Sequence, residues 1–137
     1  FISGILPESI YNITSLEILQ LSSNQLTGAI SPSIKNLKNL RTLSLFDNAM
    51  NGILPAQIGS LSNLTELSLA NNSFEGTIPS EFNQLSNLET LLLFNNKFTG
   101  KISPSIQNLP KLLNFDHLNL NEIEVSSRLT NPITQSF

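Results

Sequence analysis

Apolar positions recur along the chain with a period of 24 residues. Each unit contains the spacing L-x-x-L-x-L, and two polar columns, one of asparagine and one of glycine, keep the same phase. The five columns are Leu16, Leu40, Leu64, Leu88 and Leu112; Leu19, Leu43, Leu67 and Leu91; Leu21, Leu45, Leu69 and Leu93; Asn24, Asn48, Asn72 and Asn96; and Gly28, Gly52, Gly76 and Gly100. Columns in phase over several units indicate a stacked repeat, in which each unit buries its leucines against the next.

The leucine spacing predicts a short strand in every unit. Leu19 and Leu21 stand two residues apart, and alternate residues of a strand point to the same face. Their neighbours Gln20 and Ser22 would then point to the opposite face. Stacking aligns these strands about 4.8 Å apart as a parallel sheet, so the pattern predicts an α/β solenoid whose leucines fill the interior.

The polar columns mark the place where each strand ends and the chain turns. Backbone groups there lose their sheet partners, and an Asn amide can both donate to them and accept from them. We therefore predict an internal hydrogen-bond ladder of Asn24, Asn48, Asn72 and Asn96. The glycine column predicts a positive backbone φ or close packing between units. Five prolines place the second half of each unit on the outer arc, where no main-chain donor is needed; they are Pro7, Pro32, Pro55, Pro79 and Pro104.

The columns also predict the boundaries of the domain. We expect one solenoid of about five to six rungs over residues 1–125, with a partial first repeat at 1–15 and a tail at 126–137. Full repeats start at residues 16, 40, 64 and 88, and a degenerate last rung covers 112–125. In that last rung the third leucine column falls on His117, so we predict a register shift of three residues. The shifted pattern would be supplied by Phe115, Leu118, Leu120 and Ile123.

Composition and charge exclude several classes of function. Charged residues make up 12% of the 137 residues, the net charge is −3, and the seven Lys and Arg residues are scattered. Without a basic patch, nucleic acid is not an expected partner. No apolar run approaches the length of about 18 residues that a membrane span requires, so we expect no transmembrane segment in this chain. The absence of Cys excludes disulfide bonds and thiolate metal sites.

Catalytic chemistry finds no support in the sequence. His117 is the only histidine and follows Asp116 directly, but neighbouring residues on a strand face opposite sides. The chain has neither a P-loop nor a dinucleotide-binding glycine motif. We therefore expect no enzymatic activity, no cofactor and no metal site.

One segment carries a more specific pattern than leucine spacing alone. Residues 72–88 read N-x-F-x-G-x-I-P-x-x-F-x-x-L-x-x-L, which resembles the plant-specific class of 24-residue leucine-rich repeats. That class occurs in the extracellular regions of receptor-like kinases and receptor-like proteins, and in polygalacturonase-inhibiting proteins. The resemblance implies a curved right-handed superhelix with a concave parallel sheet, a second short strand near the L-x-G-x-I-P segment, and 3-10 or loop segments on the convex side. It also implies extracellular or plasma-membrane-attached recognition of peptides, steroid ligands, co-receptors or pathogen enzymes.

The sequence departs from that family at its ends. Family ectodomains usually carry a Cys-containing cap at each end, and this chain has no Cys. A solenoid end without a polar cap exposes a slice of core. We therefore expect an interior stretch of a longer repeat protein, or ends that are covered by further repeats, caps or neighbouring subunits.

The outward columns of the concave strands contain the candidate binding residues. Phe46 and Phe94 share a column two rungs apart, which predicts a separation of about 10 Å. With Leu92 and Ala70 they would form a small apolar patch with a polar rim, the composition that protein and peptide interfaces need. The predicted rim consists of Arg41, Asp47, Glu66, Glu89 and Asn95. Three sequons, at Asn12, Asn63 and Asn71, are candidate N-glycosylation sites.

Three functions are compatible with these features. The leading hypothesis is a recognition module from the extracellular region of a receptor-like protein or kinase, which binds a peptide or protein ligand or a co-receptor on its concave face. The second is a secreted inhibitor of a cell-wall-degrading enzyme, similar to the polygalacturonase inhibitors. The third is a structural subunit docked in a larger assembly. A transmembrane span and kinase domain further along the reading frame would favour the first, and aggregation of the isolated chain would favour the third.

Overall fold

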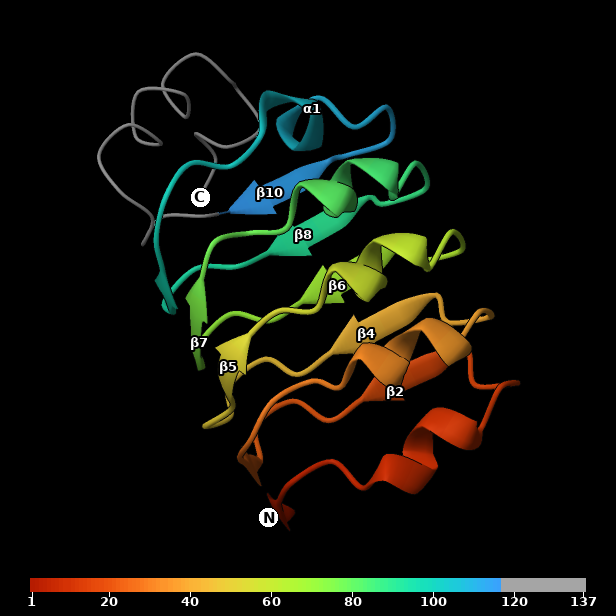
Figure 1. The fold of residues 1–137 in the computed structure, drawn as a ribbon, viewed down its shortest axis with the longest axis vertical. Helices are drawn as coiled ribbons and strands as arrows, with labels where there is room; N and C mark the ends of the chain where they lie inside the picture. The colour runs from red at the N-terminus through yellow and green to blue at the C-terminus, as the bar shows by residue number, and fades with distance from the viewer. Residues whose placement is uncertain (117–137) are drawn as a thin grey trace.

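The computed structural model describes residues 1–116, which stack as a solenoid (Figure 1). Each unit contributes one strand to a five-stranded parallel sheet, called here the main sheet. Its strands, in spatial order, are β2 (Ile18–Gln20), β4 (Thr42–Ser44), β6 (Glu66–Ser68), β8 (Thr90–Leu92) and β10 (Asn114–Asp116). Leu19, Leu43, Leu67 and Leu91 are Cα partners across successive strands. The predicted leucine-rich solenoid with a parallel sheet is therefore confirmed.

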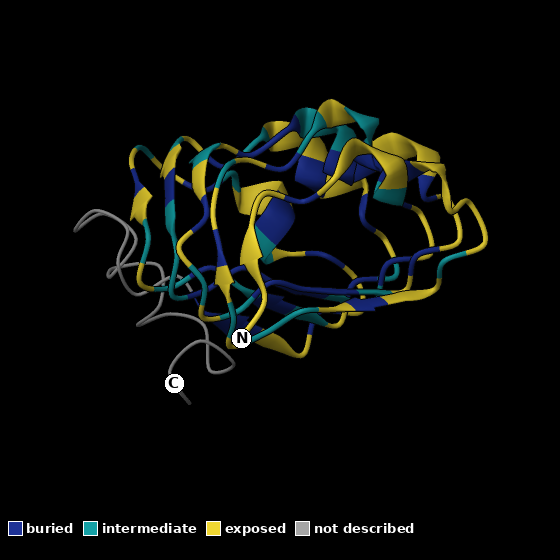
Figure 2. Cartoon of the chain, turned by 90° about the horizontal axis from the view of Figure 1, so that it is seen from below, coloured by how far each residue is buried: buried dark blue, intermediate teal, exposed yellow. Residues whose placement is uncertain are grey.

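Short helices cover the side of the solenoid opposite the main sheet (Figures 1 and 2). Four are 3-10 helices, namely η1 (Glu8–Asn12), η2 (Pro32–Asn36), η3 (Ala56–Ser60) and η4 (Ser80–Gln84), and the fifth is a single α-helical turn, α1 (Pro104–Gln107). A proline stands at the N-cap or at the first helical position of each. Because the first turn of a helix leaves its N–H groups without intrahelical partners, proline loses nothing there.

Short flank strands lie at one edge of the solenoid, between the main sheet and the helices. They are β1 (Ser3–Gly4), β3 (Gln25–Leu26), β5 (Asn51–Ile53), β7 (Ser73–Gly76) and β9 (Lys97–Phe98), paired as β1–β3 and β5–β7–β9. At Gly52 both predicted reasons for glycine are present. Its φ is +84°, and a Cβ there would lie 3.0 Å from the Cβ of Ala29 in the preceding rung.

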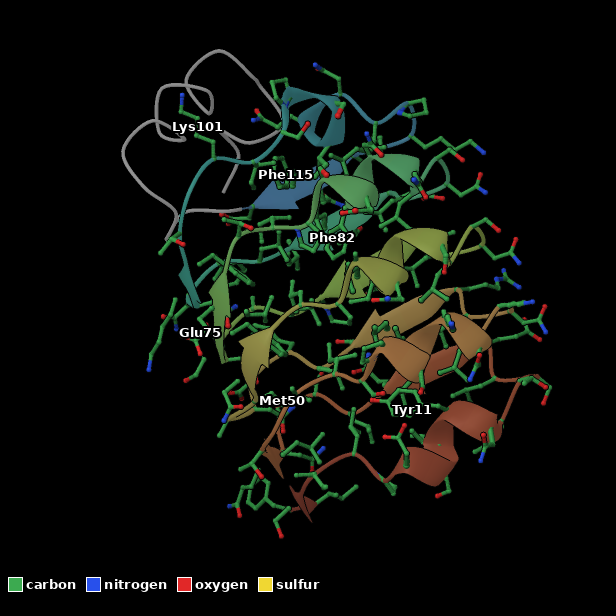
Figure 3. The ribbon with its side chains drawn as sticks, in the orientation of Figure 1. Tyr11, Met50, Glu75, Phe82, Lys101 and Phe115 are labelled. Atoms are coloured by element: carbon green, nitrogen blue, oxygen red, sulfur yellow. The ribbon has the colours of Figure 1, made fainter. Side chains whose placement is uncertain are left out.

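The core fills the space between the main sheet and the helices (Figure 2). Leu40, Leu64 and Leu88, which precede successive strands, are each 0% exposed. Aromatic side chains replace aliphatic ones at several levels, and Phe82 and Phe115 are also fully buried (Figure 3). Burial of the periodic apolar positions against their counterparts in the next rung is the main stabilising contribution.

The predicted register shift in the last rung is wrong. Phe115 pairs with Leu91 in the unshifted register and is fully buried, while Leu112 keeps the position of the first leucine column and is 8% exposed. A phenyl ring satisfies the same inward position as a leucine, so the apolar character of the column matters and not its residue type. The other residues of that prediction, Leu118, Leu120 and Ile123, lie outside the described residues, as do His117 and the tail at 126–137.

The Asn column forms a hydrogen-bond ladder along the interior turn. The Nδ2 group of Asn72 donates to the carbonyl oxygens of Leu45, Leu69 and Ala70 at 2.8–3.2 Å. Its Oδ1 accepts from the backbone N–H of Met50 at 3.0 Å. Asn48 and Asn96 make the same contacts one rung earlier and one rung later. Each amide therefore connects the turn of its own rung to that of the preceding rung.

Tyr11 provides a pH-dependent contact inside the first rung. The side chain is 1% exposed, and its hydroxyl oxygen accepts a hydrogen bond of 3.1 Å from the backbone N–H of Ser31. Burial raises the pKa of the Tyr11 phenol above its usual value, the hydrogen bond from Ser31 lowers it, and the charge of Glu8 raises it. The neutral phenol is therefore the form that the folded state prefers.

We predict that alkaline pH destabilises the protein through Tyr11. Because the folded-state pKa is raised, the stabilisation is complete below the unfolded-state pKa of about 10 and is lost as pH rises through the folded-state value. Tyr11 is the chain's only tyrosine and there is no tryptophan, so ultraviolet absorbance follows its ionisation directly. Tyr11→Phe should lower the free energy of unfolding by about 1 kcal/mol at neutral pH, because the N–H of Ser31 loses its acceptor. The substitution should also reduce the fall in stability at alkaline pH. Ionisation of Tyr11 near pH 10 in the intact fold would contradict this prediction.

Candidate functional site

The outer face of the main sheet is less open at its centre than the sequence predicted. The middle outward column consists of Gln20, Ser44, Ser68 and Leu92. Ser44 is 3% exposed and Ser68 is 4% exposed, whereas Gln20 is exposed and Leu92 half-buried. The centre of this face is therefore already covered by neighbouring side chains, and accessible groups lie towards the two ends of the strands.

An aromatic pair covers one end, where the strands run into the turn. The ring centroids of Phe46 and Phe94 are 6.3 Å apart with an interplanar angle of 61°, an edge-to-face arrangement. The predicted separation of about 10 Å is therefore too large. Between them lies Ala70, which is 0% exposed. Because alanine leaves space in the middle rung, the two rings lean together over it and bury part of each other.

Directly beyond the aromatic pair, each rung has a residue in the left-handed backbone region. The residues are Ser23, Asp47, Asn71 and Asn95, with φ between 55° and 61°. Asp and Asn tolerate this conformation better than other side chains that have a Cβ. The Nδ2 group of Asn95 also donates to Oδ1 of Asn71 at 2.7 Å. Asp47 and Asn95 thus lie beside the rings, as the sequence predicted, and backbone geometry gives a second reason for their identities.

A groove of about 650 Å³ lies at the other end of the strands. Two columns of polar residues line it, Ser15, Asn39, Asn63, Asn87 and Lys111 in one and Glu17, Arg41, Thr65 and Glu89 in the other. Arg41 and Phe46 are five residues apart along the chain, or up to about 16 Å in an extended strand. The structure therefore divides the predicted site, with Arg41 and Glu89 at the groove and Phe46, Phe94, Asp47 and Asn95 at the aromatic pair.

A second amide ladder, which the sequence analysis did not identify, borders this groove. The Nδ2 groups of Asn39, Asn63 and Asn87 donate to carbonyl oxygens of the preceding rung at 2.8–3.1 Å. At its end the Nζ group of Lys111 donates to Oδ1 of Asn87 at 2.8 Å. The signal was present in the sequence, because these asparagines are spaced by 24 residues. Asn39 and Asn63 are exposed and Asn87 is half-buried, and the hydrogen bonds of this ladder are exposed, whereas those of the interior ladder are partly buried.

The charges of this face are unequally partnered. Arg41 forms an ion pair of 3.2 Å with Glu17, and both side chains are more than half exposed. Such an exposed pair contributes about 1 kcal/mol at most. Glu66 and Glu89 make no side-chain hydrogen bond or ion pair with any of residues 1–116. Two carboxylates on neighbouring rungs are therefore free, and of these only Glu89 lines the groove. Arg41 is ion-paired, whereas Lys111 is hydrogen-bonded to a neutral amide.

The three sequons differ in their surroundings. Asn12 is exposed at the end of η1. Asn63 donates its amide N–H to the carbonyl of Lys38, and Thr65 of the same sequon donates to the carbonyl of Arg41. Asn71 is half-buried and accepts from Asn95. A glycan at Asn63 would project into the groove, and one at Asn71 would lie beside the aromatic pair.

Residues 1–116 hold neither a candidate metal site nor a candidate membrane-spanning helix. No group of three or more His, Asp or Glu side chains is arranged to hold a metal ion in this part of the chain. None of its helices combines the length and the apolar character needed to cross a membrane.

Comparison with known proteins places these observations in a family. The family model described as leucine rich repeat matches residues 14–74 and 38–98, which together cover more than half of the chain. No curated protein sequence matches the chain. Among solved structures, the leucine-rich repeat ectodomain of the membrane receptor kinase GASSHO1/SCHENGEN3 from Arabidopsis thaliana, in complex with CASPARIAN STRIP INTEGRITY FACTOR 2, is 41% identical with a TM-score of 0.81. The match covers 87% of this chain and 14% of that one.

Two further solved structures are similar over most of the chain. The plant peptide hormone receptor RGFR1 in complex with RGF2 is 32% identical, with a TM-score of 0.84, and the match covers 87% of this chain and 19% of the receptor. A plant ice-binding protein is 30% identical, with a TM-score of 0.76, over 84% of this chain and 37% of that protein. The chain thus spans less than a fifth of either receptor ectodomain. Matched over most of its described length by a family model and by these plant structures, the chain belongs to the leucine-rich repeat family, in its plant-type form.

Proposed function

We propose that the chain is a non-catalytic recognition module that binds a peptide or protein through the outer face of the main sheet. We further propose that it forms part of the extracellular region of a leucine-rich repeat receptor-like protein or kinase. The observation that carries the proposal is the division of this face into a polar groove and an aromatic pair, both held by amide ladders. Rigid ladders fix the positions of the outward side chains, which lowers the cost of ordering them on binding.

The chemistry of the two regions suits binding better than catalysis. The groove is lined by amides, hydroxyls and an ion pair, groups that hydrogen-bond to a polypeptide backbone and its polar side chains. Phe46 and Phe94 offer an apolar anchor, with Leu92, Asp47 and Asn95 around it. Aromatic anchors with a polar rim contribute most of the affinity in many protein interfaces.

Relatives of known structure support the receptor hypothesis over its alternatives. Two of them are receptor ectodomains solved with bound ligands, and the identity to one of these is higher than the identity to the ice-binding protein. A secreted enzyme inhibitor and a docked structural subunit remain the alternatives. The inhibitor would bind a cell-wall-degrading enzyme in place of a short peptide, and the structural subunit would bind neither through this face.

Selection from a displayed library of random linear peptides tests this proposal. Peptides of about twelve residues can reach from the groove to the aromatic pair. We expect the chain to enrich a related set of sequences, because a preorganised face favours particular ligands. Removal of both rings in Phe46→Ala/Phe94→Ala should then weaken binding of an enriched peptide by about thirtyfold or more. Titration of a fluorescent copy of that peptide measures the loss.

Ile53→Ala is the matched control for this experiment. Ile53 is a large apolar residue, 67% exposed, but it belongs to the flank strand β5 and not to the main sheet. Its truncation should leave the affinity unchanged. Failure to enrich any sequence, or equal losses in the control and the aromatic variant, would argue against recognition through the outer face of the main sheet.

A further inference from the structure

We propose that Asn12 carries an N-linked glycan and that a hollow beside it, at the ends of η1 and η2, seats the first sugar. The inference rests on the proposed function, because only a chain that passes through the secretory pathway to the extracellular side receives such a glycan. Two observations carry it independently. Both side chains that the sequon requires are free within residues 1–116, and a hollow with polar walls adjoins the point of attachment.

The sequon of Asn12 is less engaged in the fold than the other two. Neither the amide of Asn12 nor the hydroxyl of Thr14 makes a side-chain hydrogen bond within residues 1–116, and both residues are exposed. The side chains of Asn63 and Thr65 each donate to a carbonyl oxygen of the preceding rung. Asn71 is half-buried, and its Oδ1 accepts a hydrogen bond. A glycan on Asn12 therefore displaces no contact of the fold.

Glycan transfer changes the Asn12 amide in a defined way. A bond forms between Nδ2 and the anomeric carbon of the sugar, and the bond from that carbon to the pyrophosphate of a lipid-linked oligosaccharide donor breaks. The nitrogen loses one proton, and the lipid pyrophosphate leaves. Because Nδ2 keeps one N–H and Oδ1 stays an acceptor, the linkage needs space around the side chain and no new backbone conformation.

The position of Asn12 faces solvent in every rung. Asn12 is the last residue of η1, on the side of the solenoid opposite the main sheet (Figures 1 and 2). The equivalent residues, spaced by 24, are Asn36, Ser60, Gln84 and Asn108, and all of them are exposed. A glycan at Asn12 therefore extends from the helical side and leaves the aromatic pair of Phe46 and Phe94 accessible.

The hollow beside Asn12 has a volume of about 490 Å³. Its polar walls are formed by Thr14, Ser15, Asn36, Lys38 and Asn39. These amide, hydroxyl and ammonium groups can hydrogen-bond to the hydroxyl and acetamido groups of N-acetylglucosamine, the first sugar of an N-linked glycan. The amide of Asn36 makes no side-chain hydrogen bond within residues 1–116, so it is available to the sugar. Attachment to the wall keeps the ring at a high effective concentration beside these groups.

Secretion of the full chain from a eukaryotic cell line, with a signal peptide added, tests the modification. Enzymatic removal of glycans in heavy-oxygen water converts each glycosylated asparagine to a labelled aspartate, which peptide mass spectrometry locates. We expect the label at Asn12 in most secreted molecules. Thr14→Ala should abolish it, whereas the matched variant Thr14→Ser should retain it because the sequon is kept. A secreted chain without label at Asn12 would overturn the inference.

Trimming the glycans to one sugar tests the hollow. The trimmed chain should unfold about 3 °C above trimmed Asn12→Gln, the size that one or two hydrogen bonds give in a domain of this length. The untrimmed chain should unfold at the same temperature as the trimmed one, because the first sugar makes the contacts. In an Asn36→Ala background the difference should shrink to about 1 °C. Equal unfolding temperatures of the trimmed chain and Asn12→Gln, or an undiminished difference in Asn36→Ala, would show that the hollow does not seat the sugar.

These outcomes are distinct from those of the peptide selection. Glycan occupancy and unfolding temperatures require no ligand, so failure to enrich a peptide would overturn the proposed recognition and leave this inference standing. A secreted chain that binds an enriched peptide but has no glycan at Asn12 would overturn this inference alone.

Discussion

Replacing Asn72 with alanine is expected to lower the free energy of unfolding by about 3 kcal/mol, although a single polar side chain is removed. The three carbonyl oxygens that accept from Asn72 all have a second donor. Leu45 accepts from Asn48, Leu69 from Asn96, and Ala70 from the backbone N–H of Asp47. Among residues 1–116, the N–H of Met50 has only Oδ1 of Asn72 as its acceptor. The loss therefore comes mainly from one orphaned buried donor, together with three weakened contacts and a small void.

Two further variants separate the parts of this effect. Asn72→Asp keeps the acceptor for the N–H of Met50 but directs a carboxylate, which cannot donate, at three carbonyl oxygens. This variant should therefore also destabilise the protein at neutral pH. Asn51→Ala is the control, because Asn51 is exposed in β5 and its side chain makes no hydrogen bond within residues 1–116. Urea unfolding followed by circular dichroism gives the free energies. If Asn72→Ala and Asn51→Ala differ by less than about 0.5 kcal/mol, the ladder contributes little to stability.

The solenoid could be predicted from sequence because its period constrains burial and hydrogen bonding together. A leucine column spaced by 24 residues can be buried in every unit only if the units stack in register. An asparagine column next to those leucines is then forced into the interior, where its amide must find backbone partners. The stacking of Leu67 and the hydrogen bonds of Asn72 thus follow from the same constraint. The register in the last rung was mispredicted because the pattern was sought as leucine, whereas Phe115 fills the same space.

The candidate site was predicted less completely because outward columns are free of that constraint. The sequence places Phe46 and Phe94 in one column, but their separation depends on side-chain rotamers and on the small size of Ala70. The predicted site also grouped Arg41 with the rings, because the prediction rested on the order of the rungs and left out the distance along each strand. The second ladder, of Asn39, Asn63 and Asn87, had the right period, but only the structure supplies the carbonyl partners that give it a role.

The spacing of the rungs on the helical side depends on a glycine that lies outside the five columns. Gly59 lies in η3 at a position that is Lys35 one rung earlier and Asn83 one rung later. Lys35 and Asn83 are exposed, whereas Gly59 is buried. A Cβ on Gly59 would lie 2.4 Å from the carbonyl oxygen of Glu81, which belongs to the neighbouring helix η4 (Figure 1). Because the obstacle is backbone, a side-chain rotation cannot relieve it.

Gly59→Ala is therefore expected to destabilise the protein by about 2 kcal/mol, against the direction that helix propensity predicts. In an ordinary helical position this substitution stabilises by about 0.5–1 kcal/mol, because alanine has less backbone freedom to lose. The φ of Gly59 lies outside the left-handed region, so strain in its own backbone cannot explain a loss. Asn83→Ala, at the equivalent position of the next rung, should leave the stability within about 0.5 kcal/mol of the unmodified chain. If thermal unfolding instead shows Gly59→Ala to be as stable as Asn83→Ala, η3 and η4 can move apart at little cost, and rung spacing is set by the main sheet alone.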